Sequence, residues 1–191
     1  MTDQDPTVLV VDDDHQLADL YAAWLETEYD VRTAYGGPSA FEAIDSDVDV
    51  ALVDRLMPQV SGDELLEQIR AEGYDCRVSI VTAVDPDFDI IEMGFDEYVV
   101  KPVRREDIET VVDSLVTRSE YEQKVQEFFS LASKRAALEA RKDPYELDSS
   151  SAYTELTAAF ERLRSEIERT EAELTDRDFE IEMRRLGVTA R

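Results

Sequence analysis

The chain has 191 residues, a hydrophobic content of 43% and a formal net charge of −26 at pH 7. Its length fits one ordinary domain with an appendage, or two small domains. The aromatic residues and apolar periodicity exclude a disordered acidic chain for most of the length. A surface adapted to high salt and an acidic interaction surface both fit this charge, and acidic residues spread along the chain, not gathered in a tail, favour the first.

The charge changes character near residue 118. Residues 1–118 carry 8 Lys and Arg against 29 Asp and Glu, whereas residues 119–191 carry 12 against 17. We therefore expect two domains with a boundary at 118/119. The single cysteine, Cys76, excludes an internal disulfide and indicates a reducing compartment. The acidic first residues and the lack of a long apolar run predict a cytoplasmic protein with no membrane partner.

Apolar runs that read as strands alternate with helical patterns through the first domain. Five strands are expected at 7–11, 31–35, 48–53, 77–82 and 97–101. Helices are expected at 17–28, from Pro38 to 44, after Gly62, around 90–93, and from 108 onward. Short links between parallel strands and helices predict an α/β fold with a doubly wound, five-stranded parallel sheet.

Polar side chains stand at the carboxyl ends of four of these strands. Val50-Ala-Leu-Val runs directly into Asp54, and Pro58 prevents a helix from starting there. The other strand ends carry Asp12 and Asp13, Thr82, and Lys101. Three converging carboxylates suit a hard cation such as Mg²⁺, and an ammonium suits phosphate oxygens. A carboxylate nucleophile, a divalent cation, an ammonium and a hydroxyl are the parts that phosphoryl transfer requires.

These residues resemble the receiver domain of two-component response regulators, a flavodoxin-like fold. The resemblance covers residues 7–118. It is carried by an ordered set of motifs, namely Asp12-Asp13, Asp54 with Met57-Pro58 and Gly62, Thr82-Ala83, and Lys101-Pro102. Any one of these pairs is weak evidence, whereas the complete set on successive strand ends is specific.

The resemblance implies a role for each motif residue. Asp54 would accept a phosphoryl group from a histidine kinase. The Mg²⁺ ligands would be Asp12, Asp13, Asp54 and the backbone carbonyl of Leu56, with Asp12 acting through water. Thr82 and Lys101 would contact the phosphoryl oxygens, and Tyr98 would be the switch aromatic. The signal would leave through the face built from the helix near 90–93, the strand 97–101 and the following helix.

Some of these residues also have a simpler interpretation. Tyr98 fits an ordinary core aromatic as well as a switch. Asp14 fits a helix N-cap. Arg55 and Asp85 lie beside the expected pocket, where they could affect the lifetime of the phosphoryl group.

The remaining residues, 119–191, read as helical. The last helix of the first domain either runs on or restarts at Ser119, where Ser119-Glu-Tyr-Glu122 fits a capping box. Asp143-Pro144 breaks it. A heptad seam follows, formed by Tyr153, Leu156, Phe160, Leu163, Ile167, Thr170, Leu174 and Ile181. Such a seam must be buried, and an all-α hairpin within the chain and a coiled-coil homodimer both satisfy it.

This second part resembles the HalX domain, a helical module that follows receivers in response regulators of halophilic archaea. The likeness lies in the layout and in stretches such as Ala136-Ala-Leu-Glu-Ala. Two outputs compete: a protein-interaction or dimerisation tail, and a DNA-binding transcriptional regulator. The tail has no recognisable helix-turn-helix and is net negative, which favours the first. A basic strip of Arg162, Arg164, Arg169, Arg184 and Arg185 would favour the second. No motif after residue 118 indicates an enzymatic output.

Overall fold

The computed structural model describes residues 5–185, with side chains described as far as residue 170. The chain divides into two compact units, Met1–Val116 and Thr117–Arg191, and each is described by itself. The seam positions Leu174 and Ile181, together with Arg184 and Arg185, lie beyond the described side chains. Within residues 5–185, none of the helices combines the length and the apolar character needed to cross a membrane.

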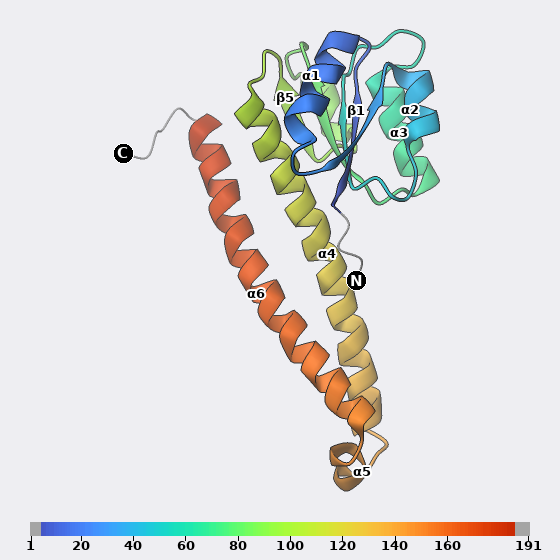
Figure 1. The fold of residues 1–191 in the computed structure, drawn as a ribbon, viewed down its shortest axis with the longest axis vertical. Coiled ribbons are helices and arrows are strands. Elements are labelled where there is room, and N and C mark those ends of the chain that lie inside the picture. Colours follow the sequence, from blue (N-terminus) through green and yellow to red (C-terminus); the bar gives the residue numbers. More distant parts are fainter. Residues whose placement is uncertain (1–4, 186–191) are drawn as a thin grey trace. The chain divides into compact units, whose positions relative to one another are not determined.

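The first unit is built on a five-stranded parallel sheet (Figure 1). The strands are β1 (Thr7–Val11), β2 (Asp30–Ala34), β3 (Val50–Val53), β4 (Arg77–Thr82) and β5 (Glu97–Val100). Their order is β2-β1-β3-β4-β5, with every neighbouring pair parallel. β1 and β3 are buried throughout, as their unbroken Val and Leu sequences require. The predicted fold class is confirmed.

Helices cover both faces of this sheet. α1 (His15–Leu25) and the start of α4 (Arg105–Glu139) pack on one face, where Ala18, Leu25, Ile108 and Val112 are buried in one apolar cluster. α2 (Gly37–Ala43) and α3 (Gly62–Glu72) cover the other face. The helix expected near 90–93 is a single 3₁₀ segment, η1 (Phe88–Glu92). It lies between Pro86 and Gly94, which leave no room for a longer helix.

Local signals set the helix ends. The Asp14 carboxylate accepts hydrogen bonds from the backbone N–H groups of Gln16 and Leu17, so the predicted N-cap is confirmed. Ser61 and Glu64 form a reciprocal capping box at the start of α3. Gly73 ends α3 at φ 75°, a left-handed conformation that favours glycine.

The second unit holds a helical hairpin. α4 continues without a break to Glu139, so the helix runs on and Ser119 is an interior helical residue and not a cap. α5 (Pro144–Asp148) begins behind an Asp143 capping box, which confirms the predicted break. α6 (Ser151–Arg185) then runs back along the C-terminal part of α4 (Figure 1).

Side-chain contacts define the hairpin. The rings of Phe128 and Phe160 stack with centroids 4.6 Å apart, and the Arg135 guanidinium lies 4.6 Å from the Phe160 ring centroid. The Tyr153 hydroxyl donates to the Glu139 carboxylate at 2.7 Å. The predicted seam therefore packs within the chain along this part.

Burial in the seam is uneven. Leu163 and Thr170 are buried, whereas Tyr153, Leu156 and Phe160 are only half-buried. On α4, Ala136 and Leu138 of the predicted apolar face are exposed. Tyr153, Leu156 and Phe160 therefore keep part of their surface open to solvent.

Candidate metal and phosphoryl site

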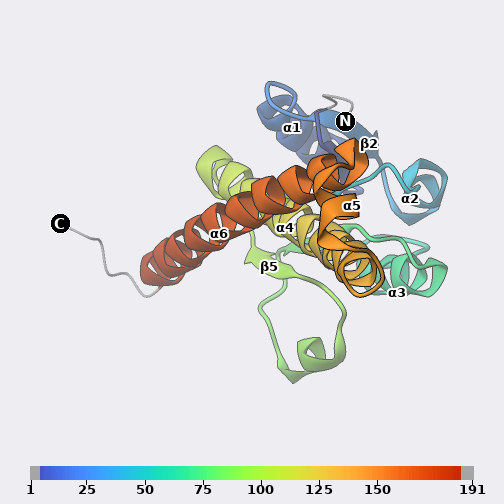
Figure 2. The ribbon, with the colours of Figure 1, turned by 90° about the horizontal axis from the view of Figure 1, so that it is seen from below.

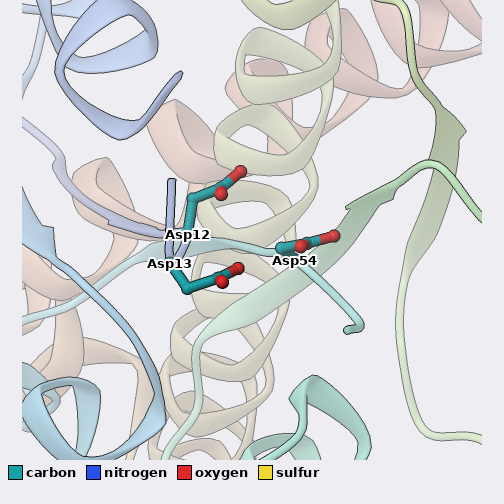
Figure 3. A group of neighbouring side chains, drawn as sticks. All are labelled: Asp12, Asp13 and Asp54. Carbon is teal, nitrogen blue, oxygen red and sulfur yellow. The ribbon is translucent and has the colours of Figure 1, made fainter. Parts of the chain in front are cut away.

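Two central strands deliver three carboxylates to one point. Asp12 and Asp13 follow β1, and Asp54 follows β3. The Asp54 backbone N–H donates to the Val11 carbonyl at 2.9 Å, which holds the two strand ends together. Figure 3 shows the three side chains projecting to the same side of the strand ends. Each offers an oxygen, and these oxygens all lie within 4.8 Å of one another.

Gly62 makes the close packing behind Asp54 possible. A Cβ atom added at Gly62 would stand 2.3 Å from the Asp54 carbonyl oxygen and 2.9 Å from the Arg55 Cα. The Gly62 N–H donates to the Arg55 carbonyl at 2.9 Å. The first turn of α3 therefore presses directly against the backbone of the candidate acceptor, and only glycine fits there.

Lys101 brings a cation to the cluster from the end of β5. Its Nζ donates to Asp12 Oδ2 at 2.7 Å and lies 3.5 Å from Asp54 Oδ1. Its backbone N–H donates to the Thr82 carbonyl at 2.8 Å, which aligns the ends of β4 and β5. One ammonium thus faces three carboxylates, so the cluster keeps an excess of negative charge.

The pKa shifts follow from burial and charge. Burial raises the pKa of the Asp54 carboxyl above its ordinary value; Lys101 opposes the shift, and Asp12 adds to it. Burial lowers the pKa of Lys101, but the hydrogen bond to Asp12 and the charge of Asp54 outweigh it and leave the pKa raised. Lys101 is therefore charged throughout the physiological pH range, and the ionised form of Asp54 is destabilised by its burial.

These residues fit a hard divalent cation. Among the described residues, no hydrogen-bond donor reaches the buried Oδ1 of Asp54. Asp12 is 3% exposed and Asp54 8%, while Asp13 is exposed and could share a cation with water. An all-oxygen cluster with one unsatisfied buried oxygen and one open side is the donor set that Mg²⁺ prefers.

Thr82 and Tyr98 lie beside the cluster. Thr82 is fully buried at the end of β4, and its Oγ1 accepts a hydrogen bond from the Val84 N–H at 3.4 Å. The half-buried Tyr98 packs on the apolar cluster of the α2–α3 face and donates from its hydroxyl to the Val84 carbonyl at 3.0 Å. Both side chains therefore meet at Val84, which places the predicted switch pair on one short segment.

The structure brings Asp12, Asp13, Asp54 and Lys101 together, as the strand-end pattern predicts. The metal-ligand role of the Leu56 carbonyl stays a prediction; the Leu56 side chain is 65% exposed. The ion pairs that Arg55 makes with Asp63 and Asp89 were not predicted. Asp63 and Asp89 lie 8 and 34 residues from Arg55 in the sequence, and no local sequence pattern predicts either pair.

Comparison with known proteins identifies both parts of the chain. Residues 8–113, more than half of the chain, match the family model of the response regulator receiver domain. The chain belongs to the response regulator family. Residues 117–183 match the model of the HalX domain, so a receiver is followed by a HalX module as the sequence predicts.

Individual relatives agree with this assignment. A provisionally named transcriptional regulator of Haloferax volcanii is 49% identical over 162 residues, covering 84% of this chain and 28% of that protein. The response regulator SaeR of Staphylococcus aureus is 29% identical over 115 residues, covering 58% of this chain and 50% of that protein. The chain thus spans half or less of the length of these relatives. The haloarchaeal relative supports a halophilic origin for the acidic composition.

Solved structures resemble the first unit. The receiver domain of a LuxO repressor protein from Vibrio parahaemolyticus aligns with a TM-score of 0.59 and 27% identity, covering 63% of this chain and 97% of that domain. A CheY-like receiver from Methanospirillum hungatei aligns with a TM-score of 0.57 and 27% identity, covering 61% and 98%.

Proposed function

We propose that this response regulator accepts a phosphoryl group on Asp54 from the phosphohistidine of a histidine kinase, in a step that depends on Mg²⁺. Asp12, Asp13, Asp54 and the Leu56 carbonyl would hold the cation. The observation that carries the proposal is the buried Asp54 Oδ1, which has no hydrogen-bond donor among the described residues and lies 3.5 Å from Lys101 Nζ. Burial is the main cause of the raised pKa of Asp54, and it removes water from the carboxylate that would act as the nucleophile.

In the reaction, an Asp54 carboxylate oxygen attacks phosphorus as the phosphorus–nitrogen bond of the donor breaks. The imidazole leaves and takes up a proton, and an acyl phosphate forms on Asp54. Bound Mg²⁺ would supply positive charge to the phosphoryl oxygens. Lys101 would contribute an ammonium, and the buried Thr82 hydroxyl would donate to a phosphoryl oxygen. Attack of water on phosphorus would later release the carboxylate.

Replacement of the nucleophile tests the chemistry. With a small phosphodonor such as acetyl phosphate and Mg²⁺, the Asp54→Asn variant should lose acid-labile, hydroxylamine-sensitive labelling. Asp14→Asn is a matched control, because it removes the same charge two residues from Asp12 and asparagine still caps α1. Labelling that persists in Asp54→Asn would place the acceptor elsewhere.

We further propose that the phosphorylated receiver signals through the face formed by η1, β5 and the beginning of α4. Thr82 and Tyr98 both contact Val84, so movement of Thr82 toward a phosphoryl group would release the Tyr98 hydroxyl. Fluorescence or NMR of Tyr98 with beryllofluoride as a phosphoryl analogue tests this switch. An environment of Tyr98 that stays the same on binding would contradict it.

The half-buried hairpin supports a homodimer through the HalX helices. Tyr153, Leu156 and Phe160 each keep one side open, and pairing of two hairpins would bury them. Light scattering in molar KCl, with and without Mg²⁺ and beryllofluoride, measures the assembly. Monomer in both conditions would contradict the dimer.

Transcriptional control is the second candidate, and the provisional name of the Haloferax volcanii relative favours it. The basic strip on α6 supports it weakly, because Arg164 is already paired with Glu168 at 3.1 Å. Binding to promoter DNA should then fall steeply with salt. Raising KCl from about 0.2 to about 1 M increases the ionic strength roughly fivefold. A DNA affinity that stays the same over this range would argue against contacts with the DNA phosphates.

A further inference from the structure

The η1 segment is weakly attached to the rest of its unit. None of its residues is buried, and Phe88 and Ile91 are 84% and 75% exposed. Figure 2 shows the connection from β4 to β5 as a wide green loop that stands away from the sheet, with η1 at its outer turn. Its backbone hydrogen bonds are local, from the Ile90 and Met93 N–H groups to the carbonyls of Asp87 and Ile90.

The Arg55 side chain reaches η1 from outside the segment. Arg55 directly follows Asp54, and its guanidinium forms an ion pair with Asp89 of η1. The same guanidinium binds Asp63 in the first turn of α3, with Nε 3.0 Å from Oδ1 and Nη2 3.1 Å from Oδ2. The Arg55 side chain is only 11% exposed, so water screens these pairs less than it screens ordinary surface pairs.

The contact between η1 and α3 is otherwise loose. A cavity of about 590 Å³ lies between them, lined by Leu66 and Met93 and by the charged groups of Arg55, Asp63, Asp89 and Glu92 among others. The cavity limits the apolar contacts between η1 and α3, and Met93, which follows η1, packs on the apolar cluster of the α2–α3 face. The Arg55–Asp89 ion pair therefore holds η1 itself, and a hydrogen bond from Arg70 Nε to the Gly94 carbonyl, at 2.9 Å, holds the chain just beyond it.

Arg55 also connects to the predicted switch. Its guanidinium pKa is raised above its ordinary value by Asp63 most and by Asp89 next, and hydrogen bonding with Tyr98 adds a smaller effect. One side chain thus binds both α3 and η1, while its backbone adjoins the acceptor and is clamped by Gly62.

We propose that Arg55 is a positioning residue that holds η1 in place while Asp54 is unmodified, and that the Arg55–Asp89 ion pair is given up when Asp54 carries a phosphoryl group. This inference rests on the proposed phosphorylation of Asp54. A phosphoryl group adds about 1.5 to 2 negative charges at the neighbouring side chain and competes for the guanidinium. Asp89 is the partner released, because its side chain is 51% exposed and η1 has no buried residue, whereas Asp63 is bound through two nitrogens within a helix.

The consequence is a coupling between the acceptor and an exposed apolar surface. Freed η1 would change the presentation of Phe88 and Ile91 to a partner. By linkage, a contact made only in the unmodified state opposes phosphorylation, so removing the contact must favour the modified state by the same factor.

Asp89→Asn removes the charge of the exposed partner and should leave the fold intact. In the unmodified protein, we expect hydrogen exchange at the Ile90 and Met93 amides to become about fivefold faster. With Mg²⁺ present, the half-saturating concentration of beryllofluoride should fall by about the same fivefold factor. A purely structural role would loosen η1 without raising the affinity for the phosphoryl analogue.

Glu92→Gln is the matched control. It removes one charge from the same segment and the same cavity wall, and the Arg55 ion pairs in the described part of the chain are with Asp63 and Asp89 and not with Glu92. It should leave both measurements unchanged. Arg55→Lys supplies a single point charge that can hold one acid at a time, and should give intermediate values.

The outcomes separate the two proposals. Wild-type protein that binds no beryllofluoride overturns the proposed function, and the coupling falls with it. Wild-type protein that binds beryllofluoride while Asp89→Asn binds it with the same or lower affinity overturns the role of Arg55 alone. Equal effects of Asp89→Asn and Glu92→Gln would also overturn it, since the cause would then be the overall charge.

Discussion

The buried carboxylate at the centre of the site should cost the folded protein stability. At neutral pH, Asp54 is ionised beside Asp12 and Asp13, and Lys101 is shared with Asp12. Asn has almost the same shape without the charge. We therefore expect Asp54→Asn to raise the free energy of unfolding by about 1 to 2 kcal/mol in Mg²⁺-free buffer at pH 7. For a domain of this size, that corresponds to roughly 5 °C per kcal/mol in Tm.

The raised pKa of Asp54 determines how the stability of the wild type changes with pH. Burial raises the folded-state pKa of Asp54 above its ordinary value of 3.8, so the folded state binds this proton more readily than the unfolded state does. Stability from this group therefore rises as the pH falls through the folded-state pKa toward 3.8, and is lost as the pH rises. The advantage of the Asn variant should be full at pH 7 and should shrink as the pH is lowered.

Bound Mg²⁺ should make the wild type more stable than the Asp54→Asn variant. A cation that binds the folded wild type stabilises it by about 2.7 kcal/mol at a hundred times its Kd, and Asp54→Asn loses one of the ligands. Urea unfolding in molar KCl at pH 7, with EDTA or Mg²⁺, measures both effects. An Asn variant that is less stable than wild type in EDTA, while Asp14→Asn remains within about 0.5 kcal/mol, would refute the electrostatic reasoning.

Three further changes test the packing around the site and in the hairpin. Gly62→Ala places a Cβ 2.3 Å from the Asp54 carbonyl oxygen; we expect a loss of about 2 to 4 kcal/mol and much reduced labelling of Asp54, by urea unfolding and acetyl phosphate labelling. Leu163→Asp buries a charge in the hairpin and should cost about 3 kcal/mol of HalX stability while leaving Asp54 labelling intact; loss of both would show that the two parts unfold together. Ser61→Ala removes the α3 capping box with Glu64 and should cost about 1 kcal/mol in urea unfolding, with labelling retained.

Much of the first unit could be predicted because its signals are local. β1 and β4 begin and end at the predicted residues, since each is a β-branched run bounded by polar residues. The site follows from the same pattern, because the carboxyl ends of parallel strands meet at one edge of the sheet. That rule alone is enough to predict, from the sequence, a cluster of Asp12, Asp13, Asp54 and Lys101.

The remaining features depend on contacts between distant residues. The capping-box pattern at Ser119 predicts a helix start, yet Ser119 is buried within α4, so helix continuation and packing override the local signal. The Arg55–Asp89 ion pair joins residues 34 apart across a loop whose path no periodicity specifies. The phosphoacceptor roles, the Leu56 ligand and the 118/119 boundary stay predictions.

The two sides of the site differ in how firmly they are held, and this difference indicates where a signal can leave. Asp12 and Asp13 directly follow β1, and Asp54 directly follows β3; both strands are buried along their whole length. Lys101 follows β5, an edge strand whose residues are half-buried or exposed, and η1 precedes that strand with no buried residue. Local opening costs least where few apolar contacts are made. A phosphoryl group anchored on the central strands should therefore leave β1 and β3 in place and move the edge of the sheet, where Tyr98 lies on β5.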